Sequence, residues 1–338
     1  IFEAEDGEIG LSQLNDHTFD LVLCDIKMPK KDGIEVLEFI MENYGDTPTV
    51  MISGHGDIDT AVACIRKGAY DYIAKPPDLN RLLTAVRNAL DNKKLIIEKK
   101  TLMYGLTFQI IFLPVVGITL STIFKTSIFS TAVVLVLLVP GGHVSGLLTH
   151  IKKGNVALSV GLTSIASMLS PFTIVLWLNI VNRDSQEFSI NFLQTFLQLV
   201  ILVLIPFLAG IYTVINKPTL AEKLSGRLDR FLKVVVLVLT FSGPIEIREL
   251  LLDNFFEGFK LAFLALIAIY LLNVVGSKTL NLSNKNSQTI TIEGLCQNFP
   301  IVLVLAATLN MPELIVFGVI YYLISTAFAV SYAFLKNI

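Results

Sequence analysis

Between residues 102 and 335 the sequence consists mostly of long apolar runs, and one of these runs is interrupted by the tripeptide Pro140–Gly142. Proline lacks an amide proton and glycine loses much backbone entropy on ordering, so an α-helix does not continue comfortably through these residues. In a lipid bilayer, irregular backbone persists only where protein buries it or where it lines a wet cavity. The break therefore predicts either a functional site in mid-membrane or a proline-kinked helix whose nearby hydroxyls bond their own carbonyls.

The 338 residues are 53% hydrophobic, but the first hundred have the mixed composition of a soluble domain. We predict a soluble domain over residues 1–92, a charged linker over 93–102 and a membrane domain over 103–338. The three cysteines have no ligand-like spacing, so we expect neither disulfides nor a zinc site. The sequence begins with isoleucine and shows no signal peptide, and we expect it to be a fragment.

Strand and helix patterns alternate in the soluble domain, which predicts an α/β fold with a parallel sheet. Expected strands are 20–25, 49–54 and 70–75, and expected helices are 33–44, 57–68 and 78–92. Because parallel strands place their carboxyl ends at one edge, the sheet should bring together Asp25, Ser53 and Lys75. A carboxylate, a hydroxyl and an ammonium group in one place suit phosphoryl transfer to the carboxylate.

The segments D-I-K-M-P-K-K-D-G, S-G-H-G and K-P, at these spacings, resemble the receiver domain of two-component response regulators, in particular its nitrogen-regulator branch. The resemblance implies a flavodoxin-like fold, with Asp25 as phosphoacceptor and Ser53 and Lys75 on the phosphoryl group. It also implies Tyr72 as a switch aromatic, Mg²⁺ on Asp25 and the Lys27 carbonyl, and a sensor histidine kinase as partner. The family's acidic Mg²⁺ pair lies on a strand that would precede residue 1. We therefore expect a truncated receiver that is phosphorylated poorly.

The second part of the sequence can be divided into eight hydrophobic spans, each long enough to cross a bilayer core of about 30 Å. They cover roughly 103–123, 129–150, 154–181, 190–215, 231–251, 256–276, 287–309 and 313–335. If the N-terminus is cytosolic, most lysines and arginines between the spans also lie inside. We predict a multi-pass protein of the inner (cytoplasmic) membrane with both termini cytosolic.

A second break lies in the seventh span, at T-I-E-G-L-C-Q-N-F-P (Thr291–Pro300). It places Glu293 in an apolar stretch, and a buried ionisable group without a partner costs several kcal/mol. The two breaks occupy corresponding members of two three-helix groups, an arrangement typical of inverted-repeat transporters. The alternative is a carboxylate that neighbouring hydroxyls merely satisfy.

P-G-G-x-x-S, the following G-N-V-A-L-S-V-x-L-T-S, the later E-x-x-x-Q-N and an earlier Q-x-x-x-x-P resemble the bile acid:sodium symporter family. The resemblance implies an all-α membrane bundle with inverted repeats and two crossing broken helices. One implied sodium site uses Ser145, Ser159, Thr163 and Glu293. The other uses Gln109, Glu293 and Gln297, with carbonyls of Gly294 and Cys296. His143 and Asn298 would face an organic anion, although His143 could instead hydrogen-bond a helix end.

Two features depart from that family. Its members have ten spans, two more than the eight predicted here. Because transport requires one group of helices to move against another, we expect a chain without these two spans to bind ligands without efficient uptake. Gly146 also stands where the family usually has an asparagine ligand. We predict a sodium-coupled symporter of an organic anion such as a bile acid or other carboxylate, with no enzyme activity and no nucleic acid binding. The alternatives are a membrane-anchored signalling receiver, or a chimeric reading frame that joins two genes.

Overall fold

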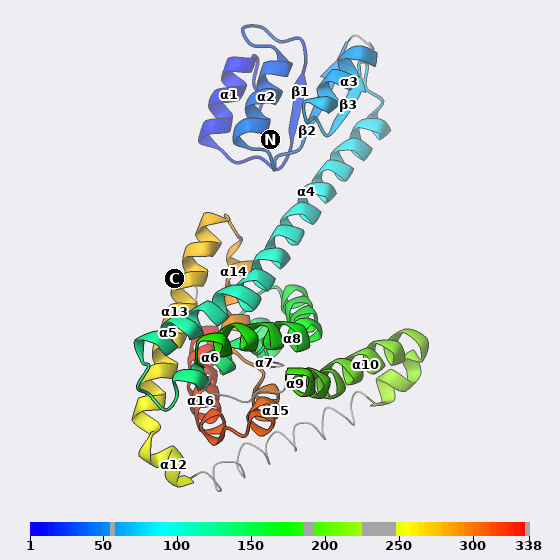
Figure 1. Cartoon of the computed structure of the whole chain (residues 1–338). Helices are drawn as coiled ribbons and strands as arrows, with labels where there is room; N and C mark the ends of the chain where they lie inside the picture. Colours follow the sequence, from blue (N-terminus) through cyan, green and yellow to red (C-terminus); the bar gives the residue numbers. More distant parts are fainter. Residues whose placement is uncertain (55–57, 143, 186–191, 225–247, 335–338) are drawn as a thin grey trace. The chain divides into compact units, whose positions relative to one another are not determined.

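Figure 1 shows the structure, a computed structural model that describes residues 1–54, 58–142, 144–185, 192–224 and 248–334. The chain forms two compact units, unit 1 from Ile1 to Lys100 and unit 2 from Thr101 to Ile338.

Unit 1 is built on a parallel sheet of three strands, in the order β1 (Val22–Asp25), β2 (Thr49–Ser53) and β3 (Asp71–Ala74). Asp25 pairs with Ile52, and Ser53 pairs with Ala74. The helices are α1 (Gly7–Asp16), α2 (Gly33–Asn43), α3 (Ile58–Arg66) and α4 (Leu79–Thr107). The predicted parallel α/β fold is therefore confirmed.

Both faces of this sheet are covered by apolar side chains. Met51 is fully buried in a cluster with Leu37 and Ile40 of α2, whereas its neighbour Val50 is buried with Ala85 and Ala89 of α4. Adjacent residues of a strand point to opposite faces, so the sheet lies between helices on its two sides.

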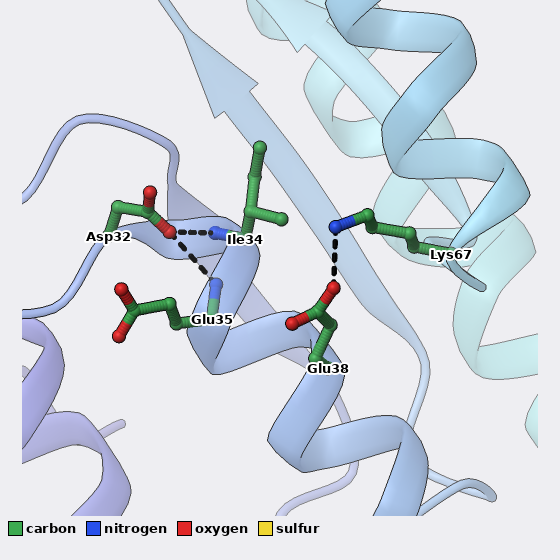
Figure 2. Close-up of polar contacts among 5 residues, drawn as sticks. All are labelled: Asp32, Ile34, Glu35, Glu38 and Lys67. Carbon is green, nitrogen blue, oxygen red and sulfur yellow. Dashed lines mark hydrogen bonds and ion pairs between the residues drawn. The ribbon is translucent and has the colours of Figure 1, made fainter.

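Helix α2 is fixed at its start by Asp32, as Figure 2 shows. The Asp32 carboxylate accepts hydrogen bonds from the amides of Ile34 (3.0 Å) and Glu35 (2.9 Å). A cap of this kind stabilises a helix by about 1 kcal/mol. Further along the helix, Glu38 pairs with Lys67, whose ammonium nitrogen lies 2.5 Å from the Glu38 carboxylate. This hydrogen bond raises the pKa of Lys67.

Helix α4 is longer than the sequence predicts. The expected helix ends at residue 92, and the expected charged linker covers 93–102, but α4 continues without interruption to Thr107. Residues 93–102 contain neither glycine nor proline, and lysine, glutamate and leucine are good helix formers.

The regular elements of unit 2 among its described residues are all helices, and Figure 1 labels most of them. Its elements are η1 (Phe108–Phe112, a π-helix), α5 (Leu113–Ile123), α6 (Ser130–Leu138), α7 (Val144–Ile151), α8 (Val156–Ser185), α9 (Phe192–Leu199), η2 (Val200–Leu204, a π-helix), α10 (Ile205–Asn216), α12 (Arg248–Asp253), α13 (Phe255–Thr279), α14 (Asn284–Leu295), α15 (Phe299–Leu309) and α16 (Pro312–Phe334). These helices agree with the predicted all-α bundle.

Four segments of the described chain are long and apolar enough to cross a membrane: Leu79–Ile123, Val156–Val181, Phe255–Thr279 and Pro312–Phe334. Three other predicted spans correspond to shorter helices, namely α6 with α7, α9 with α10, and α14 with α15. The predicted span 231–251 lies largely outside the described residues.

The core of unit 2 surrounds α6. Seven consecutive residues of this helix, 132–138, are buried, and it packs against α5 and α16. A helix that is apolar on every side is stable only when protein or lipid surrounds it completely. The Phe129 ring before α6 packs on Phe317 of α16, with ring centroids 5.5 Å apart.

Asp6 gives unit 1 a stabilising contact that depends on pH. Its carboxylate caps α1 through the Ile9 amide (2.8 Å) and lies 2.7 Å from the ammonium of Lys30. The hydrogen bond from Lys30 is the main reason that the pKa of Asp6 is lowered. A carboxylate with a lowered pKa stabilises the fold above its unfolded pKa, about 3.9, and loses this contribution as the pH falls through the folded pKa.

Asp6→Asn retains a capping side chain but removes the charge. We expect the variant to lose less stability than the wild type when the pH falls from 6 to 3. Urea unfolding followed by far-ultraviolet circular dichroism at the two pH values measures the difference. Glu5→Gln, which changes the adjacent exposed carboxylate, is the control. An unchanged pH dependence in Asp6→Asn would show that the pair with Lys30 contributes nothing.

Candidate functional site

The two predicted breaks meet in unit 2. The first separates α6, which ends at Leu138, from α7, which begins at Val144, and the second separates α14 from α15. The Gly142 amide donates to the Cys296 carbonyl (2.7 Å), and the Asn298 amide donates to the Pro140 carbonyl (2.9 Å). Between them, Gly141 and Gln297 form an antiparallel bridge. Each broken helix therefore supplies hydrogen-bond partners for the other, as irregular backbone in a membrane requires.

The two glycines permit this close approach. A methyl group on Gly142 would lie 2.8 Å from the Gln297 carbonyl oxygen, which is closer than side-chain carbons come to other atoms. A methyl group on Gly141 would lie 2.5 Å from a carboxylate oxygen of Glu293. The break thus brings the backbone of one helix directly against the acidic residue of the other.

Glu293 is fully buried, and four side chains surround its carboxylate. Oε1 accepts hydrogen bonds from Ser145 (2.6 Å) and Ser159, and Oε2 accepts from Thr163 (2.9 Å) and Gln109 (3.3 Å). These residues come from α7, α8 and η1, so three elements converge on α14. All four are among the residues that the sequence marked as sodium ligands, and all four donors are neutral.

Two oxygen atoms beside this cluster have no hydrogen-bond partner among the described residues: Oε1 of Gln109 and Oε1 of Gln297. Both side chains are at least 94% buried. Buried polar atoms nearly always have a partner, so an orphaned pair needs an explanation such as an ion or a water molecule. The carbonyls of Gly294 and Cys296 already accept one hydrogen bond each, from the Gln297 side chain and the Gly142 amide. Each carbonyl has a second lone pair that could take a cation.

Two residues, Asn298 and His143, are predicted to face an organic anion. Asn298 lies at the crossing, where it precedes α15 and its backbone bonds Pro140. His143 lies outside the described residues.

Several buried polar residues that hold α14 in place are not among those predicted from the sequence. Asn273 of α13 is fully buried, and its amide nitrogen donates to Thr291 (2.7 Å) and to the Ser287 carbonyl. Asn155, before α8, donates to Asn286 (3.0 Å), two turns before Glu293 on α14. Asn273 could have been predicted as an asparagine within an otherwise apolar helix, because a polar side chain inside a membrane normally has a hydrogen-bond partner.

A small cavity of about 10 Å³, room for one water molecule, lies beside Gln297. Its polar lining includes Ser325 and Thr326 of α16, which are not among the residues predicted from the sequence.

In unit 1 the carboxyl ends of the strands also bring the predicted residues together. The Lys75 ammonium lies 2.5 Å from Oδ2 of Asp25, and the Lys75 amide donates to the Ser53 carbonyl (2.7 Å). The Lys75–Pro76 peptide is cis. Tyr72 is half-buried in β3, and Lys27 is exposed. Among the described residues, no three His, Cys, Asp or Glu side chains are grouped to hold a metal ion.

Comparison with known families assigns both parts of the chain. Residues 1–87 match the Response regulator receiver domain, and residues 85–247 match the Sodium Bile acid symporter family. The chain joins a receiver domain to a domain of the sodium bile acid symporter family. The second match ends before α14, so Glu293, Gln297 and Asn298 lie beyond the matched residues. Members of these two families are generally not enzymes.

Among curated proteins, the C4-dicarboxylate transport transcriptional regulatory protein DctD of Pseudomonas aeruginosa is 43% identical over 86 residues, 25% of this chain and 19% of that protein. The nitrogen assimilation regulatory protein NtrX of Azorhizobium caulinodans is 39% identical over 29% of this chain and 22% of its own length. The chain thus spans about a fifth of these relatives. Among solved structures, the receiver domain of NtrX from Brucella abortus is 42% identical over 26% of this chain and 75% of its own, with a TM-score of 0.25.

The geometry of the first break predicts unequal effects at two nearby glycines. Gly141→Ala would force its methyl group against Glu293, whereas a methyl group at Gly146 has only Ser159 within 4 Å, at 3.9 Å. We expect Gly141→Ala to destabilise the detergent-purified protein by about 1–3 kcal/mol, the usual cost of overpacking. Gly146→Ala, the matched control, should change the melting temperature little. Equal melting temperatures for the two variants would contradict the close approach at Gly141.

Proposed function

We propose that unit 2 is a sodium-coupled symporter of a small organic anion, and that Na⁺ binds at Glu293. The observation that carries this proposal is a fully buried carboxylate whose hydrogen-bond donors among the described residues are all neutral, with two orphaned carboxamide oxygens beside it.

A buried carboxylate without a counter-charge is costly, because the low dielectric of the interior does not replace its hydration. Hydroxyl and amide donors offset part of this cost but leave the net charge in place. A monovalent cation between Glu293 and the surrounding oxygens would remove the charge. Hydroxyl, carboxamide, carbonyl and carboxylate oxygens are hard ligands of the kind that bind Na⁺ in the broken helices of transporters.

The same residues divide into two sodium sites that share Glu293. One comprises Ser145, Ser159 and Thr163, and the other comprises Gln109 and Gln297 with the carbonyls of Gly294 and Cys296. Only the first is short of a ligand, because Gly146 supplies no side-chain oxygen. We therefore propose a weaker first site and a stronger second site.

We propose that the organic anion binds near the crossing, next to Asn298, and that His143, which lies outside the described residues, also contacts it. Helices α7 and α15 both begin at the crossing. The N-terminus of a helix is the positive end of its dipole and favours a negatively charged group. The proposed location is the inner membrane, with both termini in the cytosol. Uptake assays with bile acids and other carboxylates identify the anion.

Thermal unfolding of the detergent-purified chain tests sodium binding. At a Na⁺ concentration 100 times the dissociation constant, binding stabilises the folded state by about 2.7 kcal/mol. We expect a rise in melting temperature of about 5–10 °C with NaCl and a much smaller rise with KCl at the same ionic strength. Glu293→Gln keeps the shape of the side chain but removes the charge, and should abolish the difference between the salts. An equal response of the wild type to Na⁺ and K⁺ would sink the proposal.

The inequality of the two sites is tested by titrating Na⁺. We expect one tight and one weak step in the wild type. Gln297→Ala should remove mainly the tight step, and Gly146→Asn should strengthen the weak step about tenfold or more, since one ligand contact contributes on the order of 1–3 kcal/mol. Two equally tight steps in the wild type would mean that Gly146 costs nothing and that the ligand assignment is wrong.

A second function is favoured by the contact between Asp25 and Lys75 in unit 1. We propose that Asp25 accepts a phosphoryl group, with Lys75 neutralising its charge and Ser53 contacting it. A sensor histidine kinase is the proposed donor. Mg²⁺ would rest on Asp25 and the Lys27 carbonyl, with few other ligands, because the described residues contain no cluster of three metal-binding side chains.

We expect slow labelling of the chain by acetyl phosphate with Mg²⁺, and no labelling of Asp25→Asn. The slow rate follows from weak Mg²⁺ binding, so raising the Mg²⁺ concentration should increase it. Gel analysis with a phosphate-affinity matrix measures the modified fraction. The control is Asp20→Asn, which changes an exposed carboxylate before the same strand. Labelling that persists in Asp25→Asn would exclude Asp25 as the phosphoacceptor.

A further inference from the structure

Trp177 of α8 is the only tryptophan of the chain, and its indole N–H donates a hydrogen bond to the backbone carbonyl of Ile110 in η1 (2.9 Å). The two residues are 67 positions apart. Carbonyls in the middle of an α-helix are normally bonded to the amide four residues later.

The Ile110 carbonyl is available because of Pro114. Residue 114 would supply the amide for this carbonyl in an α-helix, but proline has no amide proton. The backbone widens here into the π-turn of η1, with the Leu113 amide bonded to the Phe108 carbonyl five residues earlier. A carbonyl without a partner would be costly at membrane depth, and the Trp177 indole supplies that partner.

A second π-turn in unit 2 has the same local sequence cause. η2 covers Val200–Leu204, and Pro206 follows it at the same distance as Pro114 follows η1. In both places a proline just inside the next helix accompanies the widened turn.

The π-turn determines where Gln109 points. An α-helix rotates about 100° per residue, so adjacent residues seldom face the same neighbours. In η1, Phe108 and Gln109 are both buried, at 0% and 4% exposure, and both reach α14. Phe108 lies against Gly294, and Gln109 contacts Glu293. An adjacent pair that contacts the same helix fits a π-turn, which rotates less per residue than an α-helix does.

We propose that Trp177 is a positioning residue for the sodium site: by holding the carbonyl that Pro114 leaves unpaired, its indole N–H fixes the π-turn that places Gln109 beside Glu293. The inference rests on the proposed function for its effect on Na⁺. The hydrogen bond itself is independent of that function. Trp177 and Gln109 also lie close together, since both line a small cavity of about 10 Å³ with Pro140.

The test is a cycle of variants of the full chain, purified in detergent. Trp177→Phe keeps an aromatic ring but removes the donor. Pro114→Ala restores an amide that can bond the Ile110 carbonyl within the helix. We expect Trp177→Phe to lower the melting temperature in the wild type but to have little effect in Pro114→Ala. Equal decreases in both backgrounds would show that the indole does not act through this carbonyl and would overturn the proposal.

Sodium binding provides the second measurement. We expect Trp177→Phe to raise the Na⁺ concentration of half-maximal stabilisation about tenfold, and the loss to be confined to the step that Gln297→Ala also removes. Pro206→Ala is the matched control, because it alters the proline after the other π-turn, which contributes no contact to Glu293 among the described residues. A change of less than twofold in Trp177→Phe would refute the positioning role.

The two measurements separate the two ideas. If the wild type shows no response to Na⁺, the proposed function fails, and the temperature cycle still decides whether Trp177 holds the π-turn. Intrinsic fluorescence adds a direct signal, since all tryptophan emission comes from Trp177. We expect Na⁺ to shift this emission in the wild type and not in Gln109→Ala. A shift that survives in Gln109→Ala would contradict a link between the indole and the site.

Discussion

The arrangement of unit 2 depends on the exchange of two backbone hydrogen bonds between its broken helices. Helices can be interrupted within a membrane only if the freed amides and carbonyls find partners in the protein. Here each break provides hydrogen-bond partners for the other. The Gly142 amide donates to the Cys296 carbonyl, and the Asn298 amide donates to the Pro140 carbonyl. The exchange fixes α7 against α14 to within the length of a hydrogen bond. Ser145 and Glu293, which lie on either side of the crossing, are brought into contact as a result.

Side chains repair the other interruptions in the same unit. Pro171 lies inside α8, and the residue whose carbonyl it leaves without an α-helical partner is Ser167. The hydroxyl of Ser170 donates to that carbonyl at 2.9 Å. Trp177 does the same for Ile110, but from another helix. A local repair by serine stabilises one helix only, whereas a repair by a distant residue also fixes the position of one helix against another.

The sequence alone could predict the features that follow from single residues and from spacing. Pro140–Gly142 and Gly294–Pro300 mark the breaks, and the hydroxyls near the first break include three donors to Glu293. The alternation in residues 1–92 predicted the parallel sheet and the meeting of Asp25 with Lys75. What could not be predicted depends on contacts between distant positions. Nothing in the spacing connects Trp177 with Ile110, or Asn273 with Thr291, because the partners are brought together only by the packing of whole helices.

The two carboxylates at the centre of the two units are neutralised in opposite ways, and this difference separates their chemistry. Asp25 is 32% exposed and lies against Lys75, a fixed cation of the chain, so water and lysine share the stabilisation of its charge. Such a group remains reachable by a reactant from solution. Glu293 has no exposure and no charged partner among the described residues, only hydroxyls and an amide. The described residues supply no positive charge beside Glu293, and the proposed function accounts for this with a cation that binds from outside and can be released again.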